Sequence, residues 1–176
     1  MSRVCVFCAV SLDGFIARAD HGLDWLTPPP GEALEDTFGP FLAGVGALLM
    51  GRTTFDVVTS FGPEAWAYGD RPVLVATHRP LDATRPTVRP VAGPIAALVA
   101  EARAAAGPGD VYLDGGQMVG QALAAGLVDE VTLTVVPVAL GAGIAAFGGH
   151  PTPRPLGLLG ARPLGAGFVE LRYGAG

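Results

Sequence analysis

Short apolar runs alternate with amphipathic segments along most of the chain. The runs are rich in β-branched side chains, which predicts strands over 3–10, 47–50, 72–77, 88–91, 111–114, 128–138 and 168–173. Apolar residues at helical spacing predict helices over 32–44, 52–59, 94–106 and 117–125. Alternation of this kind is typical of right-handed crossovers and a mostly parallel sheet. No helix separates the last two strands, so we expect them to pair antiparallel in a mixed α/β sheet.

Two segments depart from this alternation. Residues 11–31 are rich in Gly, Asp and Pro and are too long for an ordinary connection, which is typical of a functional loop or lid. Residues 141–167 are rich in Gly and Pro, and we expect mostly loop with short strands there. Pro40 lies inside the predicted helix 32–44, where it would kink or divide the helix.

The bulk composition indicates one globular domain over residues 1–176. Half of the residues are hydrophobic, and 15% are charged. The net charge is −5, and the basic residues are scattered singly, which argues against a nucleic-acid partner. No run approaches the length of a membrane span, and the N-terminus has no signal-peptide pattern, so we expect no membrane association.

Cys5 and Cys8 form a C-x-x-C pattern, but they lie in a predicted strand. Residues three apart in a strand point to opposite faces and are separated by roughly 10 Å, which is too far for a disulfide. No second cysteine pair completes a zinc site, so we expect no metal. Two reduced core cysteines fit a cytoplasmic location.

Three predicted strands end in residues that are suited to binding phosphate. Gly115 and Gly116 separate a strand from a helix, and a helix start offers free N–H groups and a positive dipole end. Gly51 and Arg52 repeat this pattern, and the third strand ends in Thr77, His78 and Arg79. In open α/β sheets such ends share one edge, which favours an extended dinucleotide. A plain tight turn and a solvated surface arginine are the structural alternatives.

Five motifs in order resemble the dihydrofolate reductase-like superfamily, closest to the group related to the C-terminal reductase domain of bifunctional riboflavin biosynthesis enzymes. The motifs span Ser11 to Ala17, Asp24 to Leu26, Met50 to Phe55, Leu113 to Gly116 and Pro137 to Gly143. The resemblance covers nearly the whole chain. It implies a mixed sheet flanked by helices, NADPH as hydride donor, and often a homodimer. The zinc deaminase motifs of the bifunctional enzymes are absent from the sequence.

The resemblance also implies roles for individual residues. Those expected at the cofactor are Ala9, Phe15, Ile16, Gly51, Arg52, Thr53, Thr54, Thr77, His78, Arg79, Gly115, Gly116, Gln117 and Met118. Thr134 matches a position that lines the substrate pocket in dihydrofolate reductases. Trp25 would either cover the active site or anchor its loop.

The acid that helps to protonate the substrate is harder to align. The region after the Trp25 loop offers Glu32, Glu35 and Asp36, and Asp13 is an alternative polar contact; Glu35 and Asp13 are the catalytic candidates. All of these acids have structural alternatives, as solvated side chains or as a turn-forming Asp.

These observations predict an NADPH-dependent reductase of a small planar heterocycle or carbonyl compound, similar to a pterin or a ribosylaminopyrimidine. The alternative is a dinucleotide-binding protein without catalysis, and a regulatory binder of pterins or flavin precursors is a third reading. We also expect a homodimer, because strand 131–138 and the segment 139–149 are apolar with almost no charge.

Overall fold

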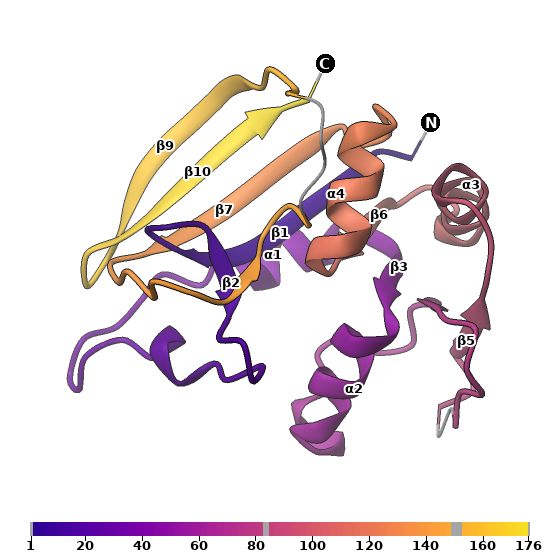
Figure 1. Cartoon of the computed structure of the whole chain (residues 1–176), viewed down its shortest axis with the longest axis horizontal. Helices are drawn as coiled ribbons and strands as arrows, with labels where there is room; N and C mark the ends of the chain where they lie inside the picture. Colours follow the sequence, from indigo (N-terminus) through magenta and orange to yellow (C-terminus); the bar gives the residue numbers. More distant parts are fainter. Residues whose placement is uncertain (1, 83–84, 149–152, 176) are drawn as a thin grey trace.

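A central sheet of eight strands organises the computed structural model, which describes residues 2–82, 85–148 and 153–175 (Figure 1). Across the sheet the strands run in the order β5 (Val88–Val91), β4 (Val73–Ala76), β3 (Val45–Gly51), β6 (Asp110–Asp114), β1 (Val4–Ser11), β7 (Glu130–Val136), β10 (Phe168–Gly174) and β9 (Gly157–Gly165). All neighbours from β5 to β7 pair parallel, whereas β10 pairs antiparallel with both β7 and β9. The predicted mixed, mostly parallel sheet with antiparallel C-terminal strands is confirmed.

Helices cover both faces of the parallel part of the sheet. On one face α3 (Ile95–Ala106) and α4 (Gly116–Ala124) pack on β1, β3, β6 and β7 through a cluster that includes Leu49, Leu113 and Val131. On the other face α1 (Phe38–Ala43) and α2 (Arg52–Ser60) pack through Phe7, Leu48 and Tyr112. Strands buried on both faces need near-continuous apolar runs, which is why the sequence pattern revealed them. Figure 1 shows that β10 and β9 extend beyond α4.

The helix expected over 32–44 is shorter than predicted, because it begins only after Thr37. The Asp36 carboxylate accepts a hydrogen bond from Gly39 N at 3.0 Å, beside the start of α1. Pro40 then falls in the first turn of α1, where a missing N–H costs little. Proline therefore marks the beginning of this helix rather than a kink within it.

The segment 141–167 was expected to be mostly loop, but it contains the nine-residue strand β9. Its glycines and Pro163 interrupt the hydrophobic pattern, so the sequence did not predict a strand here. They are tolerated because β9 is an edge strand, and proline is accepted at sheet edges.

The long segment 11–31 is partly ordered by a second, two-stranded sheet. In it β2 (Phe15–Ala17) pairs antiparallel with β8 (Ile144–Ala145). A 3-10 turn, η1 (Asp24–Leu26), follows, and a second one, η2 (Pro63–Ala65), comes after α2. Cys5 is buried, Cys8 is half-buried, and both are free thiols. Among the residues described, no helix is long and apolar enough to cross a membrane.

Candidate functional site

Two helix starts lie side by side at the carboxyl edge of the sheet. β3 and β6 are neighbours, with Met50 opposite Asp114, so α2 and α4 begin next to each other. The residues before them, Gly51 and Gly115, supply no side-chain cap to either helix. A Cβ built on Gly115 would lie 2.6 Å from Thr54 Oγ1 and 3.7 Å from Gly51 N, which shows how closely the two turns approach. Uncapped N–H groups with their positive dipole ends form a ready anion site.

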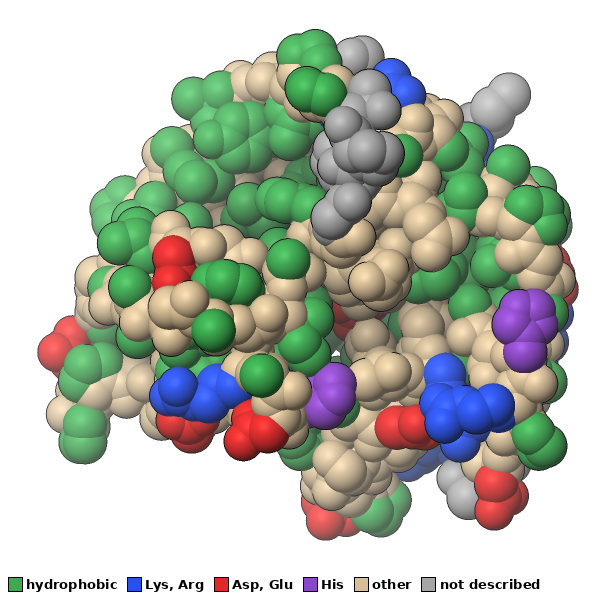
Figure 2. All heavy atoms as spheres, viewed as in Figure 1, with side chains coloured by type: hydrophobic (Ala, Val, Ile, Leu, Met, Phe, Trp, Pro, Cys, Tyr) green, Lys and Arg blue, Asp and Glu red, His purple; other side chains and the backbone are tan. Residues whose placement is uncertain are grey.

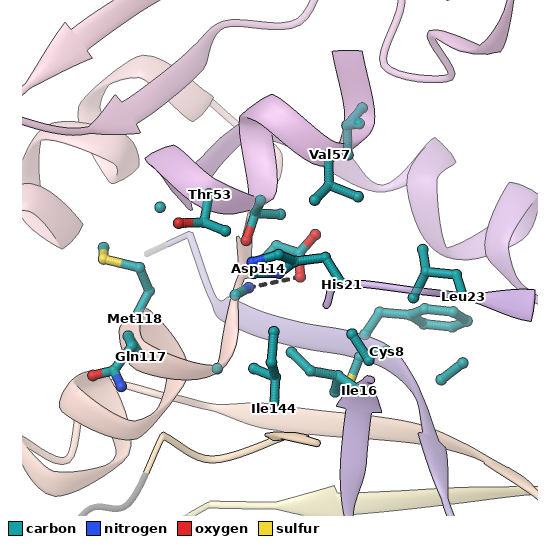
Figure 3. Close-up of a pocket in the computed structure, with 18 of the residues that line it drawn as sticks. Cys8, Ile16, His21, Leu23, Thr53, Val57, Asp114, Gln117, Met118 and Ile144 are labelled. Atoms are coloured by element: carbon teal, nitrogen blue, oxygen red, sulfur yellow. Dashed lines mark hydrogen bonds between the residues drawn. The ribbon is translucent and has the colours of Figure 1, made fainter. Parts of the chain in front are cut away.

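A cavity of about 670 Å³ opens onto both helix starts. In Figure 3 side chains from α2, α4, β1, the β2–β8 sheet and the loop after β2 surround it, with Asp114 drawn among them. Most of the predicted cofactor residues line this cavity, namely Ala9, Ile16, Gly51, Arg52, Thr53, Thr54, Gly115, Gly116, Gln117 and Met118. With Leu26, which also lines the cavity, the structure brings together four of the five motifs that the sequence singled out.

The remaining predicted cofactor residues lie outside the lining. Phe15 sits in β2, next to the lining residue Ile16. Thr77, His78 and Arg79 follow β4 just beyond Ala76, which does line the cavity. The Thr77 hydroxyl accepts a hydrogen bond from Arg79 N at 3.0 Å and so shapes this turn.

Arg52 connects the start of α2 to the turn after β4. Its Nε donates to Asp56 Oδ1 at 2.7 Å, and its Nη1 donates to the Pro80 carbonyl at 2.7 Å. Asp56 also lies 3.9 Å from Arg79 Nη2. The negative charge of Asp56 offsets the repulsion between Arg52 and the positive end of the helix dipole, which is one reason why an arginine is tolerated at the start of α2. At this contact two guanidinium groups lie beside one carboxylate.

Asp114 is the carboxyl group of this cavity, and the catalytic candidates from the sequence did not include it. Its Oδ1 accepts a hydrogen bond from Gly115 N at 2.7 Å. Burial raises the pKa of the Asp114 carboxyl above its usual value, and this effect outweighs the hydrogen bonds that lower it. A carboxyl group with a raised pKa in a cleft is suited to proton transfer. Its place at the end of β6, directly before the paired glycines, is the sequence signal that would have identified it.

Asp13 lies outside the cavity lining and is occupied by turn contacts. Its carboxylate accepts hydrogen bonds from Ser11 Oγ at 2.6 Å, Leu140 N at 3.0 Å and Gly141 N at 2.7 Å. These contacts, the Ser11 hydroxyl first, lower the pKa of Asp13 to about 2. The residue joins the turn after β1 to the segment before β8, which matches the turn-forming alternative.

Glu35, Trp25 and Thr134 also lie outside the lining. Both carboxylate oxygens of Glu35 accept from Arg162 Nη1, at 2.8 and 2.7 Å, on the far side of α1. Trp25 is buried against Val136, Leu164 and Phe168, so it anchors the loop, while its neighbours Leu23 and Leu26 reach the cavity. Thr134 lies in β7 between Ala9 and Glu170.

Gly116 has a packing role that the sequence did not reveal. A Cβ at this position would lie 2.3 Å from the Ala145 carbonyl oxygen. The glycine therefore lets β8 cross over the start of α4. By contrast, a Cβ on Gly51 would meet only Met118 Cγ, at 3.6 Å, which is ordinary contact.

The side of the cavity away from the helix starts is apolar. It is formed by Leu23 and Leu26, by Phe38, and by the α2 residues Val57 and Val58 with Phe61 beyond them. His21 also lines the cavity, from a loop tip with a backbone φ of 68°, a left-handed conformation that is uncommon outside glycine. Arg18 and Asp24 close this loop through a paired ion bridge at 2.7 and 2.9 Å. Arg18 and His21 lie in a loop, where no periodic pattern in the sequence points to a role.

Comparison with known proteins shows which family the chain resembles over most of its length. The family model of the RibD C-terminal domain matches residues 2–169. Over 171 residues the chain is 29% identical to the uncharacterized protein YwjB of Bacillus subtilis (strain 168), covering 97% of each.

Solved structures show the same fold. The “Putative riboflavin biosynthesis protein” from Shewanella sp. PV-4 matches with a TM-score of 0.87 and 29% identity over 99% of both chains. A diaminohydroxyphosphoribosylaminopyrimidine deaminase/5-amino-6-(5-phosphoribosylamino)uracil reductase from Thermotoga maritima matches with a TM-score of 0.69 and 15% identity. That match covers 99% of this chain and 57% of the other, and at this identity it shows the fold alone.

Proposed function

The chain belongs to the RibD C-terminal domain family, and from that premise we propose that it is an NADPH-dependent reductase of a small planar heterocycle or carbonyl compound. The observation that carries the proposal is the pair of uncapped helix starts facing one cavity. A dinucleotide has two linked phosphates, and the backbone N–H groups of α2 and α4 offer two adjacent anion sites to receive them. The hydroxyl groups of Thr53 and Thr54 lie in the same lining.

The residues of the cavity fit a phosphorylated dinucleotide. Arg52 and Arg79 share Asp56 at the rim, where they would meet the 2′-phosphate that distinguishes NADPH from NADH. Thr77 and His78 belong to the same rim. Ala9, Phe15 and Ile16 come from β1 and β2, where they would flank the nicotinamide. When bound, the cofactor supplies the hydride, and the protein contributes position and electrostatics.

Asp114 would hold the proton that the reduced substrate takes up. Its raised pKa keeps part of the carboxyl population protonated at a higher pH than an exposed aspartate. We assign this role to Asp114 in place of Asp13 and Glu35, because both of these are held by other partners away from the cavity. Trp25 and Thr134 would then support the substrate pocket through the packing of the loop and of β7.

One experiment separates a reductase from a non-catalytic dinucleotide-binding protein. NADPH and NADH binding are measured by calorimetry, and NADPH oxidation is followed with a panel of pterins, pyrimidines and simple carbonyl compounds. We expect NADPH to bind more tightly than NADH and at least one compound to be reduced. Tight NADPH binding with no turnover would favour the non-catalytic protein. Equal affinities for NADPH and NADH would show that Arg52 and Arg79 do not bind the 2′-phosphate.

We also propose a homodimer, through a surface that shares part of strand 131–138 with the one that the sequence suggested but does not include the segment 139–149. β7 lies inside the sheet, Leu140 packs near Trp25, and Gly149 of the segment 139–149 lies outside the described residues. The better candidate surface is the face of β7, β10 and β9 that no helix covers, where Figure 2 shows hydrophobic side chains gathered. It contains Val135, Val169 and Leu171, together with Leu158, which pairs with Tyr173 and is 61% exposed on the edge strand.

Exposed apolar surface of this kind commonly marks an interface between copies of a chain. We expect light scattering at micromolar concentration to give twice the 17.9 kDa mass of one chain. A mass of one chain would rule the dimer out.

A further inference from the structure

The two sides of the cavity differ in chemistry. Backbone N–H groups, hydroxyl groups and Arg52 gather at the helix starts. The opposite side presents Leu23, Leu26, Phe38, Val57, Val58 and Phe61, which carry no polar side-chain atom. We call these six residues the apolar wall. A planar ring is the shape that such a wall holds best, since aromatic and aliphatic side chains can pack on both faces of a ring.

Cationic side chains are scarce around the apolar wall. The chain contains eleven arginines and no lysine. Arg52 is the one arginine or lysine that lines the cavity among the described residues, and it already donates to Asp56 and Pro80. In the proposed function, Arg52 and the two helix starts are occupied by the cofactor. A phosphate on the substrate would then face the apolar wall with His21 as the one nitrogen-bearing side chain beside it, and burying a charge without a permanently charged partner is unfavourable.

Aromatic rings form the base of the apolar wall. The Phe38 ring lies 5.5 Å from the Phe7 ring and 6.2 Å from the Tyr112 ring, and all three residues line the cavity. At the rim, Phe61 is 54% exposed, so its ring is available to a molecule that enters the cavity. Among the described lining residues, Asp114 supplies a carboxyl group and His21 an imidazole that could meet polar atoms of a ring.

We infer that the substrate is an uncharged planar ring compound that carries no phosphate group. It would differ in this respect from 5-amino-6-(5-phosphoribosylamino)uracil, the compound after which the Thermotoga maritima reductase is named. A C=O or C=N carbon of the ring compound gains the hydride from the reduced nicotinamide dinucleotide. The oxygen or nitrogen gains a proton, and the dinucleotide leaves oxidised. The inference rests on the proposed function, because it assigns the helix starts to the cofactor.

The test uses pairs of compounds that differ by one phosphate. Pyridoxal and pyridoxal 5′-phosphate are one pair, and 5-amino-6-(5-phosphoribosylamino)uracil and its dephosphorylated riboside are the other. Each is titrated by calorimetry into the protein saturated with NADP⁺. We expect the unphosphorylated member of each pair to bind at least about tenfold more tightly, since the charged group must be desolvated. Equal or tighter binding of the phosphorylated members, or no binding of either pair, overturns the inference.

Variants of the rim locate the binding site. Because Phe61 is partly exposed, Phe61→Ser should fold, and it should weaken binding of the unphosphorylated ring about tenfold by removing apolar surface that the ring covers. Phe61→Arg should improve binding of the phosphorylated member. Leu12→Ser is the matched control, because Leu12 is 71% exposed and lies outside the lining. An unchanged affinity in Phe61→Ser would overturn the assignment of the apolar wall.

The cofactor titration distinguishes the two ways of failing. NADP⁺ affinity is measured first for each variant. If the parent protein does not bind NADP⁺, the proposed function itself is wrong. Normal NADP⁺ binding with a preference for the phosphorylated compounds would remove only the inference about the substrate.

Discussion

Gly51 and Gly116 are both cavity-lining glycines at helix starts, yet the structure predicts opposite outcomes for their replacement. At Gly51 the backbone φ is −73°, which any residue adopts, and a Cβ meets only the flexible Met118 side chain at 3.6 Å. Gly51→Val should therefore fold, with a loss of about 1 kcal/mol because valine is a poor N-cap residue. Its methyl groups would extend into the space that we assign to a phosphate. Losing one charge-assisted hydrogen bond costs about 1.5–3 kcal/mol, which is roughly a 10- to 150-fold loss of NADPH affinity.

At Gly116 a Cβ would lie 2.3 Å from the Ala145 carbonyl oxygen, so even alanine forces β8 away from α4. Gly116→Ala should lower the free energy of unfolding by about 1–3 kcal/mol, the usual cost of overpacking. Urea unfolding gives the stability of both variants, and calorimetry gives their NADPH affinity. The reasoning is refuted if Gly51→Val binds NADPH like the parent protein, or if Gly116→Ala is as stable as the parent.

Three further predictions concern the acids and the loop. Asp114→Asn should reduce kcat about 100-fold, within the range of general acid catalysis, without weakening NADPH binding; a parental kcat would remove Asp114 from catalysis. Because the acid acts in its protonated form and its pKa is raised, kcat in the parent protein should fall as pH rises through that pKa, and this limb should be absent from the variant. The low pKa of Asp13 stabilises the fold above about pH 4, its unfolded value, and this contribution is lost as pH falls toward about 2. Asp13→Asn should therefore lower Tm at pH 7 by more than at pH 2, whereas an equal loss at both values would contradict the assignment. Hydrogen exchange in residues 18–31 should slow when NADPH binds, whereas β2 should already be protected by its pairing with β8; unchanged exchange over 18–31 would exclude a lid.

The sheet could be predicted from the sequence because its strands are buried on both faces. Leu48, Leu49 and Met50 are fully buried, as are Val73, Leu74 and Val75, so each run is apolar without interruption. β9 escaped prediction for the opposite physical reason. It is an edge strand that exposes most of its residues, and its sequence therefore records no burial pattern.

The pair of helix starts at the cavity could also be predicted from the sequence, whereas the rest of the cavity lining could not. Backbone N–H groups at helix starts need glycine at fixed positions, and a short motif records that need. The acid and the apolar wall depend on tertiary contacts. Asp13 is held away from the cavity by Leu140, and Glu35 by Arg162, both of which lie far away in the sequence. Asp114 is buried at the end of β6, and that burial also depends on the tertiary structure.

The position of Asp114 and the pairing of the two helix starts have a common origin in the topology. Parallel pairing of β3 and β6 brings two helix starts to the same edge of the sheet, and it also places the last residue of β6 next to them. The helix dipoles alone would favour the ionised carboxylate, since their positive ends point toward it. Burial outweighs that effect and raises the pKa of Asp114. A bound diphosphate would add negative charge beside the carboxyl group and raise its pKa further, so cofactor binding itself would help to keep the proton on Asp114 until the substrate takes it.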